Sequence, residues 1–239
     1  MRGVIVAAGT SSRLRPLTDA TPKGLLDVGG RGILERSVAC LHEAGVDEIL
    51  MVVGFEREQL MERFAGRARF VYNPFYRETN NMASLWFALE HLSDEPLLYL
   101  HGDLVYDAAL LTPMLASGTR GVALLVDDGI AVDTEAMKVR VKEGRFVESS
   151  KEISLQDAAG EWIGIATFGA EGVREFRAEA SALLHERRFQ DYDTAAFTRM
   201  AARGVPVDLV STGGAAWVEV DFAEDLERAR RVFAGDGTP

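Results

Sequence analysis

Short apolar stretches alternate with amphipathic stretches along the first half of the chain. Residues 3–7 form a compact apolar run, and residues 33–44 have the spacing of a helix that ends at Gly45. The same alternation continues to residue 127 through the expected strands EILMVV, RFVYN, PLLYLH and VALLVD and the expected helices REQLMERF, MASLWFALEHL and AALLTPML. Alternating strands and helices are typical of βαβ units with right-handed crossovers, so a mostly parallel sheet is expected.

The pattern changes near Asp127. From there to residue 168 the chain reads as KVRVK, a Glu143-Gly144 turn, RFVESS and WIGIATF, which is typical of antiparallel hairpins. Helices are expected again over residues 173–184 and 193–202, followed by strands VDLV and AWVEV and a closing helix, DFAEDLERARRVF. We therefore expect one α/β domain over residues 1–239, with residues 127–168 as an antiparallel insertion.

Composition places the chain among ordinary globular proteins. Of its 239 residues, 47% are hydrophobic, and no apolar run approaches the roughly 18 residues that a membrane span needs. No charged leader with an apolar core is present, and the one cysteine, Cys40, excludes an intrachain disulfide. We therefore expect a cytoplasmic protein without membrane insertion.

Charge narrows the class of ligand. The 26 basic and 37 acidic residues give a net charge of −11, which argues against nucleic-acid binding. The same field repels phosphate ligands, so a phosphate site requires a local cluster of cations or a bound metal. The loop after the first strand carries such cations in Arg13, Arg15 and Lys23.

That loop matches neither of two familiar phosphate-binding patterns. Gly9 is not followed by the glycines of G-x-G-x-x-G, and Lys23 precedes its glycine, unlike the lysine of a P-loop. The pattern is instead A-A-G-x-x-x-R-L followed by P-K. Gly9 allows close backbone approach, loop amides bind anions, and Arg13 and Lys23 supply charge, so a phosphate cradle is still expected.

The stretch AAGTSSRLRPLTDATPKGLL resembles the signature of nucleotidylyltransferases that couple a nucleoside triphosphate to a phosphorylated sugar or alcohol. This resemblance implies a Rossmann-like α/β fold of the nucleotide-diphospho-sugar transferase type, with helices on both faces of a mostly parallel mixed sheet and a small antiparallel extension. It also implies catalytic roles for Lys23 and Arg13 at the phosphates, with the nucleotide along Ala7, Ala8, Gly9 and Thr10.

A second stretch, YNPFYRETNNMASLWFAL, resembles the choline-phosphate and aminoalkylphosphonate cytidylyltransferases. Asn80 and Asn81 stand at the start of an expected helix, where their amides and Ser84 offer hydrogen bonds to a pyrimidine edge. Asn80 also suits a simple helix cap, and the two roles are compatible.

Two aspartates follow strands far apart in the sequence. Asp103 follows LLYLH and Asp221 follows AWVEV, and open α/β sheets bind ligands at the carboxyl ends of their strands. The resemblance implies that this pair holds Mg²⁺, which is commonly bound by one or two carboxylates together with phosphate oxygens. Asp107 and Asp225 are alternative ligands close by in sequence, and a turn or cap role is the plainer interpretation of either strand-end aspartate.

The segment D-x-E-x-M-K-V, S-K, G-E-x-I-G-I again resembles the cytidylyltransferases. The resemblance implies that Lys151, or Lys138 as a second candidate, holds the acceptor phosphate and that Glu161 touches the acceptor or ribose. Carboxylates and aromatic rings attract an ammonium group, so further acceptor contacts are expected from Asp133, Tyr192 and Trp217. Solvated acids on a hairpin and aromatic rings in the core are the alternative interpretation.

These features predict a Mg²⁺-dependent cytidylyltransferase that joins CTP to 2-aminoethylphosphonate, phosphocholine or a similar monoester and releases pyrophosphate. The expected partners are CTP and that small acceptor, and the oligomeric state is left open. The alternatives are a sugar-1-phosphate or inositol-phosphate nucleotidylyltransferase and, more remotely, a non-catalytic nucleotide-binding domain.

Overall fold

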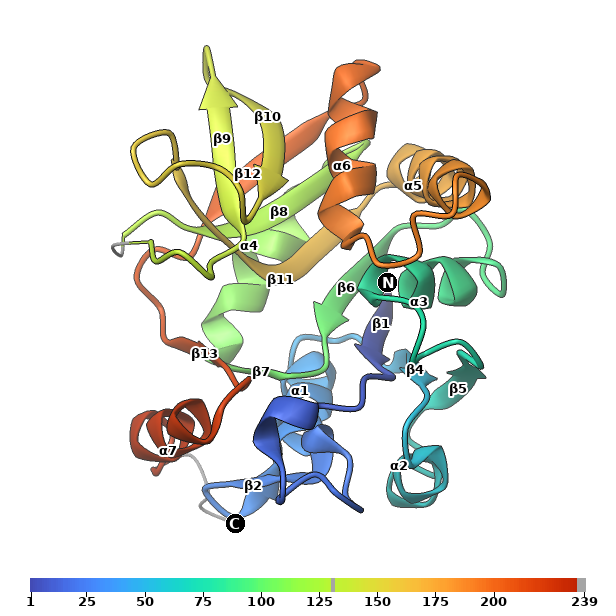
Figure 1. Ribbon diagram of the computed structural model, residues 1–239, viewed down its shortest axis with the longest axis vertical. Coiled ribbons are helices and arrows are strands. Elements are labelled where there is room, and N and C mark those ends of the chain that lie inside the picture. Colours follow the sequence, from blue (N-terminus) through green and yellow to red (C-terminus); the bar gives the residue numbers. More distant parts are fainter. Residues whose placement is uncertain (130–131, 236–239) are drawn as a thin grey trace.

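A computed structural model describes residues 1–129 and 132–235 of the chain (Figure 1). Strands β1 (Arg2–Ala7), β4 (Glu48–Val53), β5 (Arg69–Tyr72) and β6 (Leu97–His101) form a parallel group in the order β5-β4-β1-β6. The helices that connect these strands are α1 (Ile33–Glu43), α2 (Arg57–Arg63) and α3 (Asn81–Leu89). The expected mostly parallel α/β fold is confirmed.

The sheet continues beyond β6 through β11 (Gly160–Phe168), which runs antiparallel to it. One part of β11 pairs with β8 (Val122–Asp127), which in turn pairs in parallel with β12 (Val207–Ser211). The start of β11 pairs with β9 (Lys138–Lys142), whose hairpin partner is β10 (Arg145–Ser150). Figure 1 shows this hairpin at the opposite end of the molecule from the closing helix α7 (Ala223–Val232). The expected antiparallel extension is therefore confirmed.

Alternating residues of the strands build a core on each face of the sheet. Val4 belongs to one core, which includes residues of α3, of α5 (Ala170–His185) and of α6 (Asp193–Ala202). Its neighbour Ile5 belongs to the other core, with residues of α1, α2 and α4 (Leu111–Ala116). Among the described residues, no helix is both long and apolar enough to cross a bilayer.

A smaller ladder closes the carboxyl edge of the parallel strands. Strand β7 (Leu104–Tyr106) follows β6 after a two-residue turn and pairs antiparallel with β13 (Trp217–Glu219). A third apolar cluster joins this ladder to the opening loop and α7 through Leu14, Val105 and Val218. The shorter elements of this region are β2 (Asp27–Val28), β3 (Arg31–Gly32) and the 3-10 turns Ser12–Leu14, Lys23–Leu25 and Ala108–Leu110.

Candidate functional site

Several strands end at one edge of the sheet. At the ends of β1 and β6, Val6 is paired with His101. At the end of β8, Asp127 is paired with Glu161, near the start of the antiparallel β11. A cleft of about 840 Å³ opens at this edge. The sequence-predicted residues that line it are Ala8, Gly9, Arg13, Asn80, Asn81, Ser84, Asp103, Asp133, Lys151, Glu161, Tyr192, Trp217 and Asp221.

Lys23 joins the two aspartates that the sequence singled out. Its Nζ donates to Asp103 Oδ2 and to Asp221 Oδ1, each at 2.9 Å. Arg13 donates to Asp221 Oδ2 at 3.0 Å, so both carboxylate oxygens of Asp221 have a cationic partner. The backbone holds the aspartates in place, because Val220 N donates to Asp103 O at 3.0 Å. Four segments of the chain thus meet at one charged centre.

Electrostatics at this centre favour the charged forms. Burial alone would lower the pKa of Lys23, but the Asp103 and Asp221 carboxylates outweigh burial and raise it. Burial likewise opposes ionisation of Asp103, and the Lys23 charge outweighs it, so the pKa of Asp103 lies below its ordinary value. Asp103 Oδ1 is buried and accepts no hydrogen bond from any described residue. This oxygen is therefore a free acceptor within a charged site.

The rival aspartates serve local structure. Asp107 Oδ1 accepts from Ala109 N at 2.8 Å and caps the short turn after β7. Asp225 Oδ2 accepts from Phe222 N at 2.9 Å and from Asp221 N at 3.2 Å, which caps α7 and orients Asp221. Asp103 and Asp221, rather than these neighbours, are the pair bridged by Lys23.

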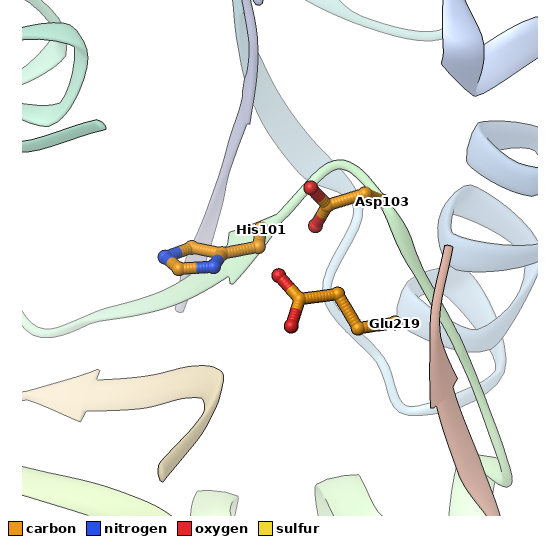
Figure 2. A group of neighbouring side chains, drawn as sticks. All are labelled: His101, Asp103 and Glu219. Carbon is orange, nitrogen blue, oxygen red and sulfur yellow. The ribbon is translucent and has the colours of Figure 1, made fainter. Parts of the chain in front are cut away.

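Glu219 is a member of the site that sequence reasoning missed. Figure 2 shows its carboxylate directed toward His101 and Asp103, and one potential ligand atom from each residue lies within 4.8 Å of the others. Burial, with the nearby Asp103 and Asp221 charges, raises the pKa of Glu219 to about 7. The sequence held a signal for Glu219. Trp217 was predicted to face the acceptor, and Glu219 lies two residues later on the same strand, β13, so the two side chains point to the same face.

His101 belongs to a buried polar network that extends to α6. Its Nε2 lies 3.0 Å from Asp193 Oδ2, which also accepts from Tyr99 Oη at 2.7 Å. Burial would lower the pKa of His101, but the hydrogen bond and charge of Asp193 outweigh it and raise the pKa to about 9. Asn81 joins the network by accepting from Asp193 N at 3.0 Å. The network fixes the end of β6 against α3 and α6.

The predicted base-contacting residues line the cleft but already have protein partners. Asn80 Oδ1 accepts from Asn81 N at 2.8 Å, so the expected cap at the start of α3 is present. Asn80 Nδ2 donates to Gln190 O at 3.3 Å, and Ser84 Oγ accepts from Asn73 Nδ2 at 3.0 Å. Their contacts with a base stay a prediction.

The opening loop reaches the cleft only in part. Ala8 and Gly9 line the cleft, whereas Ala7 and Thr10 do not. A Cβ atom added at Gly9 would meet no other atom within 4 Å, so the glycine leaves space at the cleft rather than relieving a clash. The loop is held by Thr18, whose hydroxyl donates to Ser11 O at 2.8 Å.

Three carboxylates gather on the other side of the cleft. Burial, together with the charges of Asp133 and Asp127, raises the pKa of Glu161 to about 7. Trp217 Nε1 donates to Asp127 Oδ2 at 2.6 Å and brings its indole to the same region. This side of the cleft is therefore acidic and partly aromatic.

The two predicted acceptor lysines lie in different places. Lys151 lines the cleft, 3.5 Å from Glu135 Oε2 and 5.9 Å from the centre of the Tyr192 ring. Lys138 is 2% exposed and is not part of the lining, because its ammonium donates to backbone carbonyls of the preceding loop. Lys138 therefore does not reach the cleft in this structure, and contact between its ammonium and an acceptor phosphate stays a prediction.

Fold and site together define an α/β protein with a cation-bridged carboxylate pair at the carboxyl edge of its parallel strands. The sequence model of the MobA-like NTP transferase domain matches residues 3–143, which is more than half of the chain. The protein belongs to this family.

Individual relatives carry more specific names. The chain is 30% identical over 235 residues to the bifunctional IPC transferase and DIPP synthase of Aquifex aeolicus, covering 95% of this chain and 50% of that protein. It is 37% identical over 97 residues to the choline-phosphate cytidylyltransferase of Streptococcus pneumoniae, covering 39% of this chain and 42% of the relative. The matched regions thus span half or less of these relatives.

Solved structures share the fold. A structure described as CTP:phosphocholine cytidylyltransferase from Streptococcus pneumoniae has a TM-score of 0.77 at 20% identity, covering 97% of this chain and 98% of that one. The inositol-1-phosphate CTP transferase from T. maritima has a TM-score of 0.80 at 19% identity, covering 98% and 96%. The expected fold of the nucleotide-diphospho-sugar transferase type is confirmed.

Proposed function

We propose that this protein is a cytidylyltransferase that joins CTP to a small phosphonate or phosphate monoester and releases pyrophosphate. The observation that carries the proposal is the bridge from Lys23 to Asp103 and Asp221, with Arg13 beside it, at the edge where α/β sheets bind nucleotides. The choline-phosphate cytidylyltransferase and the 2-aminoethylphosphonate cytidylyltransferase of Lancefieldella rimae, 38% identical over 105 residues and covering 43% of this chain and 42% of that protein, support the choice of CTP.

The residues of the site fit Mg²⁺. Asp103 and Asp221 supply carboxylate oxygens, the donors that this ion prefers, and Asp103 Oδ1 is buried without a hydrogen-bond partner among the described residues. Glu219 adds a third carboxylate next to Asp103. Mg²⁺ bound there would neutralise phosphate charge and polarise the α-phosphate.

Positioning and charge stabilisation dominate phosphoryl-type transfer, and the chain has groups for both. In this proposal Lys23 and Arg13 stabilise negative charge on the α-phosphate and on the leaving pyrophosphate. Lys151 holds the acceptor so that its oxygen attacks the α-phosphorus in line, and the bond from that phosphorus to the pyrophosphate oxygen breaks. The attacking oxygen is already ionised at neutral pH, so the reaction needs no general base.

The acceptor in this proposal carries an ammonium group. Asp127, Asp133 and Glu161 lie near one another, and together they favour a cation that can replace the proton held by Glu161. Trp217, whose indole N–H donates a hydrogen bond to Asp127, offers an aromatic face of the kind that binds ammonium groups. Hydrogen-bonding carboxylates favour a primary amine over a quaternary one, so 2-aminoethylphosphonate is preferred to phosphocholine.

A second candidate is an inositol-phosphate or sugar-1-phosphate nucleotidylyltransferase. The solved structure that supports this candidate by name is the inositol-1-phosphate CTP transferase from T. maritima, which shares the fold over 98% of this chain. A non-catalytic nucleotide-binding domain is a more distant alternative, which the presence of Lys23 and the aspartate pair disfavours.

We also propose a cytoplasmic location, because a sequence with one cysteine has no intrachain disulfide to maintain.

The deciding experiment is pyrophosphate release from each of four nucleoside triphosphates crossed with 2-aminoethylphosphonate, phosphocholine, inositol 1-phosphate and hexose 1-phosphates. We expect CTP with an aminated acceptor to turn over fastest, because unpaired polar groups make a site reject wrong partners by orders of magnitude. Equal turnover with ATP or GTP would contradict the choice of CTP. Faster turnover with inositol or hexose phosphate would establish the second candidate.

A further inference from the structure

Lys138, the first residue of β9, places a buried ammonium group beneath a loop. The side chain is 2% exposed, and its Nζ lies 3.0 Å from Thr134 O, 3.3 Å from Ala136 O and 3.5 Å from Asp133 O. The backbone N of Lys138 also donates to Ala136 O at 3.0 Å. An ammonium has three hydrogens and no acceptor, so these carbonyls match its hydrogen-bonding capacity.

The same loop is held from within by Asp133. Its Oδ1 accepts from Glu135 N and from Ala136 N, each at 2.8 Å. The Asp133 carboxylate thus satisfies the amides of a turn whose carbonyls are satisfied by Lys138. Removing the ammonium would leave Thr134 O without the donor it has here, whereas Ala136 O would keep the backbone N–H of Lys138.

The turn contributes to the acceptor side of the cleft. Asp133, Glu135 and Ala136 line the cleft, whereas Lys138 does not. Glu161 is paired in register with Lys138 across β11 and β9, and Glu135 is the partner of Lys151. The position of the turn therefore sets the spacing between Asp133 and Glu161, and between Glu135 and Lys151.

We propose that Lys138 is a positioning residue for the acceptor. The Lys138 ammonium holds the 133–136 turn by donating to the backbone carbonyls of the turn. Asp133 is thereby kept opposite Glu161, and Glu135 is kept beside Lys151. This inference rests on the proposed function, since it assigns the acceptor to this side of the cleft. The nucleotide phosphates are expected near Arg13 and Lys23, in another part of the site, and do not depend on the turn.

The test compares Lys138→Met with Lys142→Met, an exposed lysine on the same strand. Methionine replaces most of the apolar stem, ends one atom short of the ammonium and has no donor. We expect Lys138→Met to raise KM for 2-aminoethylphosphonate at least about tenfold, the scale of one lost positioning contact, with KM for CTP within twofold of wild type. Lys142→Met should leave both constants unchanged, and Lys138→Arg should recover part of the loss because it retains a buried donor.

Hydrogen exchange gives a readout that does not depend on turnover. In the wild-type protein the amides of Glu135 and Ala136 should be protected, and in Lys138→Met they should exchange faster while those of β1 and β4 stay unchanged. Rapid exchange at both amides in the wild type would overturn the inference even if Lys138→Met failed to fold. Release of pyrophosphate by the wild type, with an unaltered acceptor KM in folded Lys138→Met, would also overturn it and leave the proposed function standing. No release by the wild type with any acceptor would defeat both.

Discussion

Lys23 balances the charge of the Asp103 and Asp221 pair, because one ammonium is shared by the two carboxylates. We expect Lys23→Met to lower turnover roughly 10²-fold, the scale seen when one preorganised charge contact is removed. Pyrophosphate release under saturating substrates measures this. Arg15→Met is the matched control, since Arg15 belongs to the same loop but pairs only with Asp19 among the described residues and does not contact Asp103 or Asp221. Normal turnover in Lys23→Met would contradict a role in the reaction.

The same substitution should also lower stability. The loop position of Lys23 suggests an exposed cation, yet its side chain is only 12% exposed and pairs with Asp103. Loss of the ammonium leaves a carboxylate poorly solvated, which costs about 1–3 kcal/mol. Denaturant unfolding measures this cost, and turnover should be compared well below the unfolding midpoint so that the two effects stay separate.

Asp103 and Asp221 should behave as one unit. Asp103→Asn and Asp221→Asn should each shift half-activation by Mg²⁺ to higher concentration, and the double variant should lose much less than the sum of the single losses. Activity measured across a Mg²⁺ titration tests this. Asp107→Asn alters only the cap of the short turn before α4, so its activity should depend on Mg²⁺ concentration as in the wild type. Strictly additive losses would mean that the pair does not serve one ion.

Glu161 should make stability depend on pH. Its pKa rises from 4.5 to about 7 on folding, so between these values the folded protein holds a proton that the unfolded chain has lost. Stability from this group is therefore highest below pH 4.5, falls as pH rises through the window, and reaches its lowest level above about pH 7. Denaturant midpoints measured from pH 5 to pH 8 should fall less in Glu161→Gln than in wild type. Parallel pH profiles would contradict the assignment.

Among the elements, β11 connects the two halves of the site through an irregularity. Gly164 lies within the register shift of this strand with φ of 87°, and a Cβ there would approach His101 Nδ1 to 2.6 Å. Gly164→Ala should therefore cost more than the roughly 1–3 kcal/mol of backbone strain alone. Gly144→Ala is the control, because Gly144 has a φ of 73° and open space around its Cβ position. Denaturant unfolding of both variants isolates the clash with His101, and equal losses would contradict it.

Elements with a strong local pattern were predictable, and those defined by partners were not. The parallel strands follow from apolar runs, and the β9–β10 hairpin follows from Glu143-Gly144, which both have positive φ. Strand β7 has three residues and follows β6 closely, so only its pairing with β13 distinguishes it. Lys138 illustrates the same limit at one residue, because the carbonyls that bury its ammonium belong to a turn whose path depends on the folded chain.

At the scale of the whole molecule, acid outweighs base even inside the cleft. The bases at the cleft are Arg13, His101, Lys151 and Arg228 in its lining and Lys23 between two of the acids, against the lining acids Asp103, Asp127, Asp133, Glu135, Glu161, Glu219, Asp221 and Asp225. With a net charge of −11, this field repels a triphosphate at long range. The composition predicts the repulsion. It does not predict that the acids of the cleft outnumber its bases, because only the folded structure shows which residues line the cleft.

This field predicts an unusual response to salt. Raising ionic strength from about 0.01 M to 0.1 M shortens the Debye length from roughly 30 Å to 10 Å and screens the repulsion. The association rate of CTP should therefore increase with salt over this range, as measured by stopped-flow fluorescence, while that of uncharged cytidine should not change. A rate that decreases with salt would mean that the local cations dominate the approach.

The bridge between Lys23 and Asp221 spans 198 residues of sequence, which has a consequence for the newly made chain. Protein synthesis adds about 5–20 residues per second, so roughly 10–40 s pass between the emergence of the lysine and that of its second carboxylate. Asp103 lies 80 residues after Lys23, so within that interval Lys23 first has neither carboxylate and then has Asp103 alone. The nascent chain therefore cannot form the complete Lys23 bridge until residue 221 has been made, and we expect any activity that depends on the bridge to appear only when the β13 segment has left the ribosome and paired with β7.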